Sequence, residues 1–554
     1  MITVPRLRAT ARKAFYRVGL ILLGLPVAGA VAAVMEPPTS YLTAIVIMLT
    51  FAGLQAMLYL MASRIHVLDA ELLYILLHMR LVASGKPPVG RIFRAIADFP
   101  QVYGGYSRLF RSIYDLGKEW GYSFPKAVSI MADSVEGEIL RNILQRLSGV
   151  LAVGEDVEEF FEREYRTLLA EYENVYTRTM NSARVLLGIY VTMLGSLVFL
   201  VSTFMVLAFF FGGDTRILYL SYAAVTVGAV LLGLLVFMSL KQEPFEYRGD
   251  PEILKYRLLK AAGGLAMALG AAVGAGIVYL RGGLDFTGLV MAYAAAGLLL
   301  LPIGILARME ESKVRNVDEF FPVFIRSYGS HLSTVGNMVK ALEPLLISNL
   351  GILMGPIKRL YTRLKNSINP SIAWDLFSAE TGSEMARRGI IIFTDTVEAG
   401  GDPNLAGALI SDHHNDMNRL RKLRYQVAST FSSTLFIMHG AAIIILLIMS
   451  KLLELFSNIL QQLTTQLPPE IASIFPFRSM DVSLLPLLNL VFVTTLVIVN
   501  SAVVTRVTPG SKTSFYFYLS LYLLLSAGSI FIAVEIIDFV IGSIVVPQDI
   551  VPQL

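Results

Sequence analysis

Long apolar runs constrain this chain more than any other feature. We count about nine that can cross a bilayer as helices, since the hydrocarbon core needs about 20 consecutive apolar residues. No segment of useful length alternates apolar and polar residues, so we expect almost no strand. The sequence therefore predicts an all-α integral membrane protein with about nine transmembrane helices. They lie near residues 15–35, 41–62, 184–211, 216–240, 258–280, 285–307, 427–450, 484–505 and 514–541.

Composition limits the classes of function. Apolar residues make up 55% of the chain and charged residues 16%, which is too apolar for an ordinary soluble protein. The net charge of +4 is small and no long basic run occurs, so we expect no nucleic-acid partner. The chain has no cysteine, which excludes disulfides and thiolate chemistry. The basic N-terminus with its first apolar run mimics a signal peptide, but we expect a retained anchor because no convincing cleavage site follows.

Two long polar blocks divide the spans. With the N-terminus inside, 42 of the 46 Lys and Arg residues fall on the cytoplasmic side, as the positive-inside rule requires. We therefore predict a multi-pass protein with a cytoplasmic N-terminus and an extracytoplasmic C-terminus. The predicted units are 1–62, a cytoplasmic tail with two spans; 63–183, a first cytoplasmic helical domain; 184–307, four spans; 308–426, a second cytoplasmic helical domain; and 427–554, three spans with an extracytoplasmic loop.

The two polar blocks read as copies of one domain. Each opens with an acidic N-cap and an apolar helix that a glycine ends, from Asp69 to Gly85 and from Asp318 to Gly336. Gly85 would superpose on Gly336, and Pro322 fits the first turn of the second helix. Each block closes with a long amphipathic helix that runs into a span. We therefore expect two duplicated helical domains.

The order of short motifs in the second block resembles a known family. After the helix at 318–336 come Asn349-Leu-Gly351, Ala373-Trp-Asp-Leu-Phe377 and Glu398-Ala-Gly-Gly-Asp-Pro403. Together with the membrane layout, this order resembles the type II secretion system F family, the platform proteins of type IV pilus-like machines, and especially its archaeal branch. The resemblance runs from about residue 65 to about residue 448. The first two and last two spans rest on hydropathy alone.

The resemblance implies a function in filament assembly. It implies a non-enzymatic platform in the plasma membrane of an archaeal type IV pilus-like machine, either an archaellum or an adhesion pilus. The two F-type domains would couple a separate cytoplasmic secretion ATPase, hexameric by resemblance, to the transfer of pilin- or archaellin-like subunits into a filament. In an archaellum the same coupling would also drive rotation. A homodimer is implied as well, and membrane lipids are the remaining expected partner.

Motifs for catalysis or metal binding are missing from the sequence. No Gly-x-x-x-x-Gly-Lys-Ser/Thr loop occurs, and the nearest echo, Pro509-Gly-Ser-Lys-Thr513, lacks the leading glycine and a preceding strand. His413 and His414 are adjacent, so their rings point to different helix faces, and a solvated polar face fits them better than a metal site. We therefore predict no enzyme activity, no cofactor and no metal site.

Two charged segments are candidate docking sites. The first, an acidic helix start, consists of Glu155, Glu158, Glu159 and Glu162. It is either a solvated N-terminus favoured by the helix dipole or a surface for a basic partner. The second, a basic stretch before the seventh span, consists of Arg419, Arg421, Lys422 and Arg424. It either anchors against anionic headgroups or contacts an ATPase or a pilin, and both can hold. The opposite charges suggest that the two copies face different partners.

The alternative function is a multi-span transporter or channel with cytoplasmic regulatory domains. It would need buried polar groups or broken helices at mid-membrane depth. Charged residues inside the spans are few, and Lys451, Glu454, Glu535 and Asp538 lie near span ends. The glycines at 263–276 are the best candidates for a broken helix, although small residues at this spacing more often allow close helix packing.

Overall fold

Helices make up all the regular secondary structure of the described chain. The computed structural model describes residues 69–135, 137–210, 215–249, 254–281, 283–466, 482 and 484–544. Within these ranges no strand occurs, and the one isolated β-bridge joins Glu246 to Ser383. The prediction of an all-α fold is confirmed. The N-terminal unit 1–62 with its two predicted spans lies outside the described residues, as do residues 467–481 and 545–554.

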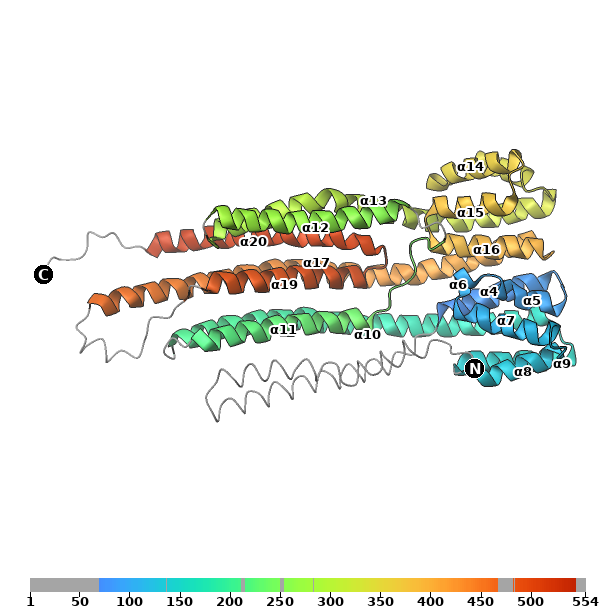
Figure 1. Ribbon diagram of the computed structural model, residues 1–554, viewed down its shortest axis with the longest axis horizontal. Helices are drawn as coiled ribbons and strands as arrows, with labels where there is room; N and C mark the ends of the chain where they lie inside the picture. Colours follow the sequence, from blue (N-terminus) through green and yellow to red (C-terminus); the bar gives the residue numbers. More distant parts are fainter. Residues whose placement is uncertain are drawn as a thin grey trace.

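Seven helices within the described residues are long and apolar enough to cross a membrane. They match the seven spans predicted between residues 184 and 541, whereas the total of nine stays a prediction. Four contain little beyond a span, and three continue far outside it (Figure 1). The seven helices are α10 (Val157–Phe210), α11 (Thr215–Ser239), α12 (Leu254–Leu280), α13 (Phe286–Val335), α17 (Pro403–Gln466), α19 (Leu485–Val507) and α20 (Phe515–Ile544).

The shorter helices gather at one end of the molecule and pack on the extensions of α10, α13 and α17 (Figure 1). We call this end the helical body and the seven spans the membrane bundle. We keep the name copies for the two polar blocks, although their duplication stays a prediction. The first copy contributes α4 (Ala70–Ser84), α5 (Val89–Ala97), α6 (Pro100–Tyr103), α7 (Gly105–Lys118), α8 (Phe124–Ser134) and α9 (Glu138–Val153). The second contributes η2 (Lys340–Leu346), η3 (Gly351–Leu353), α14 (Met354–Lys365), α15 (Pro370–Thr381) and α16 (Glu384–Glu398).

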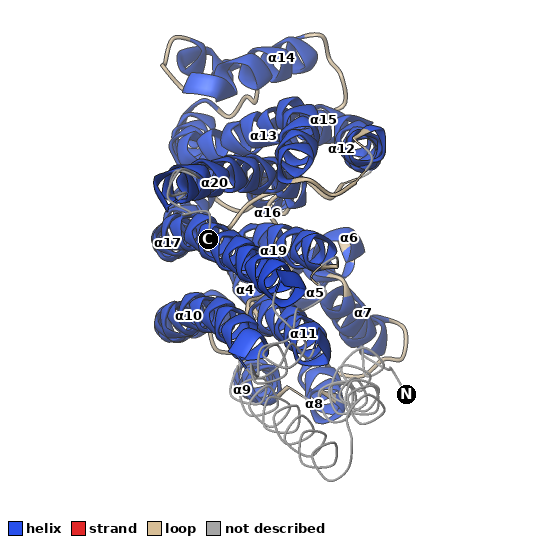
Figure 2. Cartoon of the chain, turned by 90° about the vertical axis from the view of Figure 1, so that its left-hand side faces the viewer, coloured by secondary structure: helices blue, strands red, loops and turns tan. Residues whose placement is uncertain are grey.

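The membrane bundle is layered. Seen along its long axis, α12 and α13 lie on one side, α10 and α11 on the other, and α17, α19 and α20 between them (Figure 2). A short turn with η4 (Lys512–Ser514) joins α19 to α20. Because α17 is central in the bundle and also enters the helical body, it connects every layer of the molecule.

Asp318 is not the helix cap that the sequence predicts. Helix α13 runs without a break from Phe286 to Val335, and both Asp318 and Pro322 are buried inside it. A cap is unnecessary because the span already supplies the preceding turns. Gly336 does end the helix, with a left-handed φ of 67°. The carboxylate of Asp318 is therefore free to serve contacts far away in the sequence.

Gly85 ends α4, but its role differs from that of Gly336. Its φ is −77°, and the neighbouring Lys86 takes the left-handed conformation instead. A Cβ atom at Gly85 would lie 2.8 Å from the backbone of both Gly400 and Gly401. Glycine is needed here because the two copies approach each other backbone to backbone.

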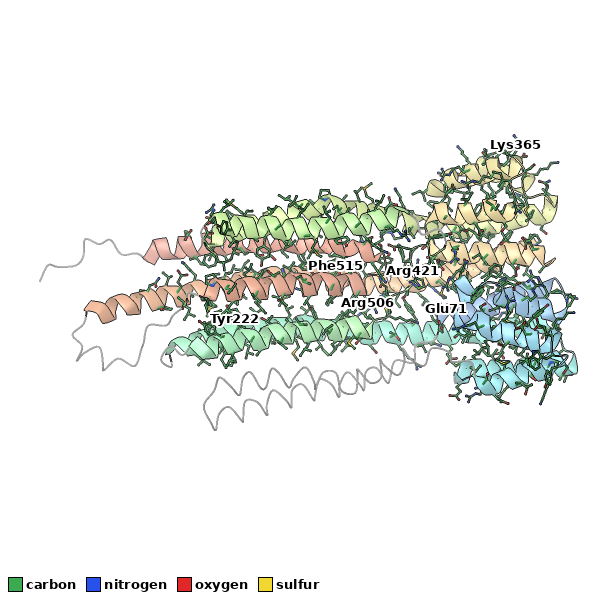
Figure 3. All side chains as sticks on the ribbon, in the orientation of Figure 1. Glu71, Tyr222, Lys365, Arg421, Arg506 and Phe515 are labelled. Carbon is green, nitrogen blue, oxygen red and sulfur yellow. The ribbon has the colours of Figure 1, made fainter. Side chains whose placement is uncertain are left out.

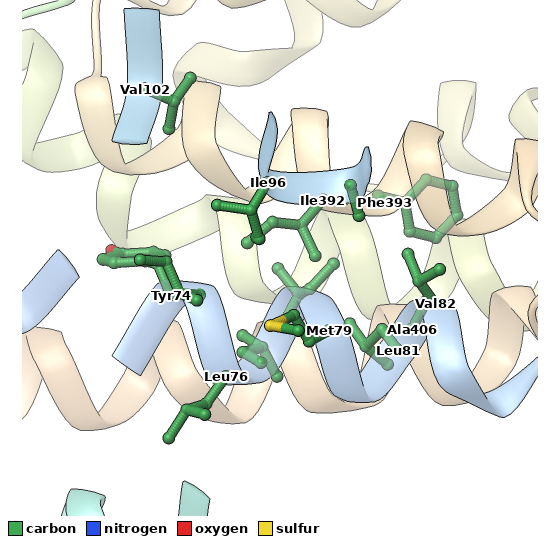
Figure 4. Close-up of a cluster of buried hydrophobic side chains, with 14 of the residues drawn as sticks. Tyr74, Leu76, Met79, Leu81, Val82, Ile96, Val102, Ile392, Phe393 and Ala406 are labelled. Atoms are coloured by element: carbon green, nitrogen blue, oxygen red, sulfur yellow. The ribbon is translucent and has the colours of Figure 1, made fainter. Parts of the chain in front are cut away.

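One hydrophobic core runs through both copies. It contains buried side chains from α4 to α10 together with others from α13 to α17. Helix α4 is buried on nearly every face, as expected for a helix that is apolar all round. Figure 4 shows its Met79 and Val82 beside Ile392 and Phe393 of α16. The predicted copies are thus fused into a single body.

Polar side chains link the spans inside the membrane bundle. Asn500 of α19 accepts a hydrogen bond from the Tyr190 hydroxyl at 2.6 Å and lies 2.9 Å from Nδ1 of His439. Nε2 of His439 lies 3.0 Å from the Ser526 hydroxyl. A second group joins Tyr222, Asn489 and Ser450. The bundle therefore holds the buried polar groups that a transporter would need, but they are satisfied by one another.

Three of the five glycines in the fifth predicted span, Gly263, Gly270 and Gly274, lie against another helix. A Cβ atom at Gly263 would overlap the ring of Tyr516, and one at Gly270 would lie 3.3 Å from the backbone of Ala296. Helix α12 is continuous through all of them. The structure therefore favours close helix contact over a broken helix at this place.

Candidate functional site

A buried cluster of charges lies where the helical body meets the membrane bundle, and we call it the charged hub. Its centre is Arg421 of α17, whose Nη1 donates to Oδ2 of Asp318 at 2.6 Å. Both side chains are buried. The Asp318 carboxylate also accepts from the hydroxyl of Ser383, which caps α16. The hub thus connects α13, α16 and α17, and Figure 3 shows Arg421 at this junction.

Arg424 extends the hub to the third layer of spans. Its guanidinium donates to the backbone carbonyls of Val507, Lys241 and Arg506 at 2.9–3.0 Å. It also pairs with Glu243 at 3.2 Å. These carbonyls lie at or just beyond the C-terminal ends of α11 and α19, where backbone acceptors lack a partner within the helix. The Arg424 side chain therefore links α11, α17 and α19.

Glu243 is the acidic partner of both arginines. Its Oε1 accepts a hydrogen bond from the Tyr176 hydroxyl of α10 at 2.7 Å, and Nε of Arg421 lies 3.8 Å from Oε2. Burial alone would raise the pKa of Glu243, but the guanidiniums of Arg424 and Arg421 hold it below its ordinary value. The carboxyl is therefore ionised, and the hub is a network of paired charges.

Hydrogen bonds join the segment between α11 and α12 to the second copy. The backbone of Tyr247 donates to the carbonyl of Gly382 at 2.9 Å, and Glu384 donates back to Phe245 at 3.3 Å. The buried Glu384 carboxylate accepts from the backbone of Arg248 at 3.0 Å and pairs with Arg388 at 3.4 Å. These contacts fix the segment that follows α11 to the N-terminal end of α16.

A second buried group clamps the two copies together. His78 of α4 bonds to the Tyr103 hydroxyl through Nδ1 and to Asp395 of α16 through Nε2, both at 2.9 Å. Arg91 reaches the same carboxylate at 2.6 Å. Burial alone would raise the pKa of Asp395, but His78 and Arg91 lower it. Arg388 adds a contact over the ring of Tyr74.

His413 and His414 do not form the solvated polar face that the sequence predicts. Their side chains are 1% and 0% exposed, because α17 lies between helices of both copies. His413 bonds to the Tyr165 hydroxyl at 2.9 Å, and His414 lies 2.9 Å from the carbonyls of Ile410 and Met385. Burial lowers the pKa of both imidazoles. Both rings serve the internal packing of the body.

The acidic docking candidates lie at the start of α10, and the structure gives half of them internal partners. Glu155 is exposed, and the backbone of Glu158 is capped by Asp156. Glu159 pairs with Arg163 one turn later. Glu162 pairs with Arg80 of α4 at 2.8 Å. A docking role for these four residues stays a prediction.

The basic docking candidates are divided by the structure. Arg419 and Lys422 are exposed, and each reaches a carboxylate on a neighbouring helix, Glu173 and Glu319 respectively. Arg421 and Arg424 are internal parts of the charged hub and present no surface to a partner. Among the described residues, no ion pair joins the acidic candidates to the basic ones. A docking role stays a prediction for Arg419 and Lys422.

The turn at 509–513 is filled by a carboxylate of the chain itself. The backbone N–H of Ser511 donates to Glu311 of α13 at 3.3 Å, and the hydroxyl of Ser514 donates to the same oxygen. A Cβ atom at Gly510 would lie 2.6 Å from the Glu311 carboxyl carbon. This turn therefore holds α13 and α20 together, and the backbone N–H of Ser511 already donates to a carboxylate of the protein.

Sequence reasoning missed the acidic members of these clusters. Glu243, Glu311 and Asp395 belong to no motif, and their partners lie far away along the chain. A carboxylate within an apolar helical pattern, as at Asp318 and Glu311, could have indicated them. Burying an ionised carboxylate costs free energy unless it is paired, so such a residue predicts a buried cationic partner.

Comparison with known proteins gives consistent matches. Residues 75–205, from α4 into α10, match the family described as Type II secretion system (T2SS), protein F. The Flagella accessory protein J of Methanocaldococcus jannaschii is 26% identical over 404 residues, which cover 71% of each protein. That of Methanococcus voltae is 24% identical over 344 residues, 60% of each. No solved structure matches significantly. On these matches, the chain is similar to the type II secretion system F family over residues 75–205 and to the two accessory proteins over 71% and 60% of its length.

Proposed function

We propose that this protein is the membrane platform of an archaeal type IV pilus-like machine, an archaellum or an adhesion pilus. In this proposal the helical body is cytoplasmic and receives a separate, hexameric secretion ATPase. The membrane bundle holds pilin- or archaellin-like subunits at the base of the filament, and the platform works as a homodimer. The F-family match and the two accessory-protein relatives support this proposal.

The observation that carries the coupling is the continuity of α10, α13 and α17. They contain 54, 50 and 64 residues, and at 1.5 Å per residue the shortest spans about 75 Å. Each lies partly in the shared core of the body and partly in the bundle. The charged hub ties α11 and α19 to them through Arg424. A displacement of the body by an ATPase would therefore be transmitted to the spans along three helices that continue from one part into the other.

The coupling is tested by interrupting one helix. Three glycines inserted between Gln426 and Val427 make α17 flexible at the membrane boundary, and the same insertion after Gly283, in the turn before α13, is the control. In a deletion strain of the host, we expect the control to restore filaments. The α17 insertion should reach the membrane and co-purify with the ATPase but build no filament. Normal filaments from the α17 insertion would contradict the coupling, and absence of an ATPase partner would contradict the platform.

A further inference from the structure

Two turns of the first copy lie at the end of the helical body that is farthest from the membrane bundle. Helix α10 begins at this end and runs toward the membrane, so α9, which ends at Val153 just before it, also reaches this end (Figure 1). The hydroxyl of Ser148, late in α9, donates to the carbonyl of Pro125, at the start of α8, at 2.8 Å. Helix α8 is therefore antiparallel to α9, and the turn between α7 and α8 lies at the same end.

Three large apolar side chains on these two turns are exposed, and we call them the aromatic tip. Trp120 is 73% exposed, Tyr122 is 45% exposed and Val153 is 77% exposed. The other tryptophan of the chain, Trp374, is only 3% exposed and lies in the core of the second copy. Exposed apolar side chains that gather in one place mark sites of interaction with another protein.

The turn between α7 and α8 is held in one conformation by the body. Gly121 takes a left-handed φ of 72°, and the backbone N–H of Tyr122 donates to the carbonyl of Leu116 at 3.1 Å. Phe124, at the start of α8, packs against Phe93 of α5 with ring centres 5.6 Å apart. The turn is therefore ordered before any partner arrives, and an ordered surface loses less conformational entropy on binding.

The second copy has a similar turn without the aromatic residue. Between α14 and α15, Ser367 takes the left-handed conformation, with a φ of 59°, and the backbone N–H of Ile368 donates to the carbonyl of Arg363 at 3.0 Å. The residue before Ser367 is Asn366, whereas Trp120 stands before the left-handed glycine of the first copy. The turn thus forms with a polar residue at this place, so folding does not require the tryptophan.

Unpaired carboxylates surround the aromatic tip. The segments 118–126 and 153–158, which contain the two turns, carry four carboxylates and two lysines. None of these six side chains takes part in an ion pair within the part of the chain that the structure describes. The rim is therefore acidic overall and complements a basic surface. The six residues are Glu119, Glu155, Asp156 and Glu158, and Lys118 and Lys126.

The position of the aromatic tip excludes a lipid as its partner. The predicted span of α10 begins near residue 184, and α10 itself begins at Val157, so about 40 Å of helix separates the two. Headgroups extend only about 5–7 Å beyond the hydrocarbon core on each side. With a cytoplasmic helical body, the tip therefore faces proteins of the cytoplasm.

We propose that the aromatic tip is the surface on which the secretion ATPase docks. Trp120 enters an apolar pocket of the ATPase, and Glu155 and Glu158 face basic residues at the rim of that pocket. Tryptophan is enriched among the residues that dominate binding energy, whereas charges at a rim mainly set the rate of association. This inference rests on the proposed function, which supplies the ATPase, and it adds the surface that the ATPase contacts.

Binding of the purified, full-length chain in detergent to the purified secretion ATPase of the same host tests this proposal. Biolayer interferometry gives both the affinity and the rates. Trp120→Asn, which introduces the residue that the second copy has at this place, should weaken binding about 30-fold or more, as expected for the loss of a dominant interface residue. Because Trp120 is exposed, this variant should melt at the temperature of the wild type.

The matched control is Ile347→Asn in the second copy. Ile347 is 90% exposed, so its loss also removes an exposed apolar side chain. It lies nearer the membrane, because Gly351, four residues later, packs against the ring of Phe320, about 22 Å along α13 from its end at Val335. The control should bind the ATPase as the wild type does.

Charge reversal separates the rim from the anchor. Glu155→Lys with Glu158→Lys should slow association with the ATPase about tenfold at low salt and much less at high salt, where exposed charges are screened. An association rate that is unchanged at low salt would contradict the acidic rim.

Two results would overturn the docking surface while leaving the proposed function intact. One is an ATPase affinity that Trp120→Asn leaves unchanged or that Ile347→Asn lowers equally. The other is a Trp120→Asn chain that binds the ATPase normally but changes its own oligomeric state in mass photometry, because the tip would then join two copies of the chain. If the wild type itself does not bind the ATPase, the proposed function fails and this inference fails with it.

Discussion

Removing one partner of the buried pair between Asp318 and Arg421 is expected to cost far more than removing both. Arg421→Met leaves the Asp318 carboxylate buried with only the Ser383 hydroxyl as partner, and such a loss costs about 3–5 kcal/mol of stability. Asp318→Leu leaves the guanidinium with Glu243, 3.8 Å away, and should cost a similar amount.

The double variant Asp318→Leu, Arg421→Met buries neither charge. Glu243 keeps Arg424 and Tyr176, so the main loss is the partner of the Ser383 hydroxyl, about 1–3 kcal/mol. The two single changes would sum to about 6–10 kcal/mol if they acted independently. The double-mutant cycle should therefore show a coupling of several kcal/mol.

Unfolding in mixed micelles, followed by loss of helical circular dichroism, measures these free energies. Lys422→Met is the matched control on the same helix, because its pair with Glu319 is exposed and is worth about 0–1 kcal/mol. Additive costs in the double variant would refute the hub as a coupled network. A cost for Arg421→Met no larger than that of Lys422→Met would refute the burial argument.

Three further predictions follow from single contacts. Gly85→Ala should destabilise the body by about 1–3 kcal/mol, because the new Cβ atom meets the backbone of the other copy. Gly105→Ala is the control, because a Cβ atom there meets nothing within 4 Å. Equal melting temperatures of the two variants would contradict this prediction. The pKa of Asp395 is lowered in the folded state, so its stabilisation is complete above its ordinary pKa of about 4 and is lost as the pH falls through the folded value. Thermal melts from about pH 6 to about pH 3 should therefore fall less steeply for Asp395→Asn, and parallel curves would count against the clamp. The chain has no cysteine, so single cysteines can be introduced as topology probes. In intact cells, Asn366→Cys should be protected from an impermeant thiol reagent and Gly283→Cys should be labelled. The reverse pattern would invert the proposed topology.

Segment types could be predicted from the sequence because they depend on local periodicity. Runs of apolar residues indicate spans wherever they occur, and the seven predicted between 184 and 541 are helices in the structure. The division into units at 62, 183, 307 and 426 and the inside position of the N-terminus stay predictions. The predicted docking residues illustrate the limit: a run of four basic residues on α17 looks uniform in sequence, although Arg419 and Lys422 face outward and Arg421 and Arg424 face inward.

By itself, the sequence determined an all-helical membrane protein with two similar polar blocks, because hydropathy and helical period are properties of neighbouring residues. Only the tertiary structure decided that the blocks share one core and that His413 and His414 are buried in it. It alone paired Asp318 with Arg421 across 103 positions and His78 with Asp395 across 317. Such pairs form when distant helices pack and leave a buried charge no other partner, and no local pattern carries that information.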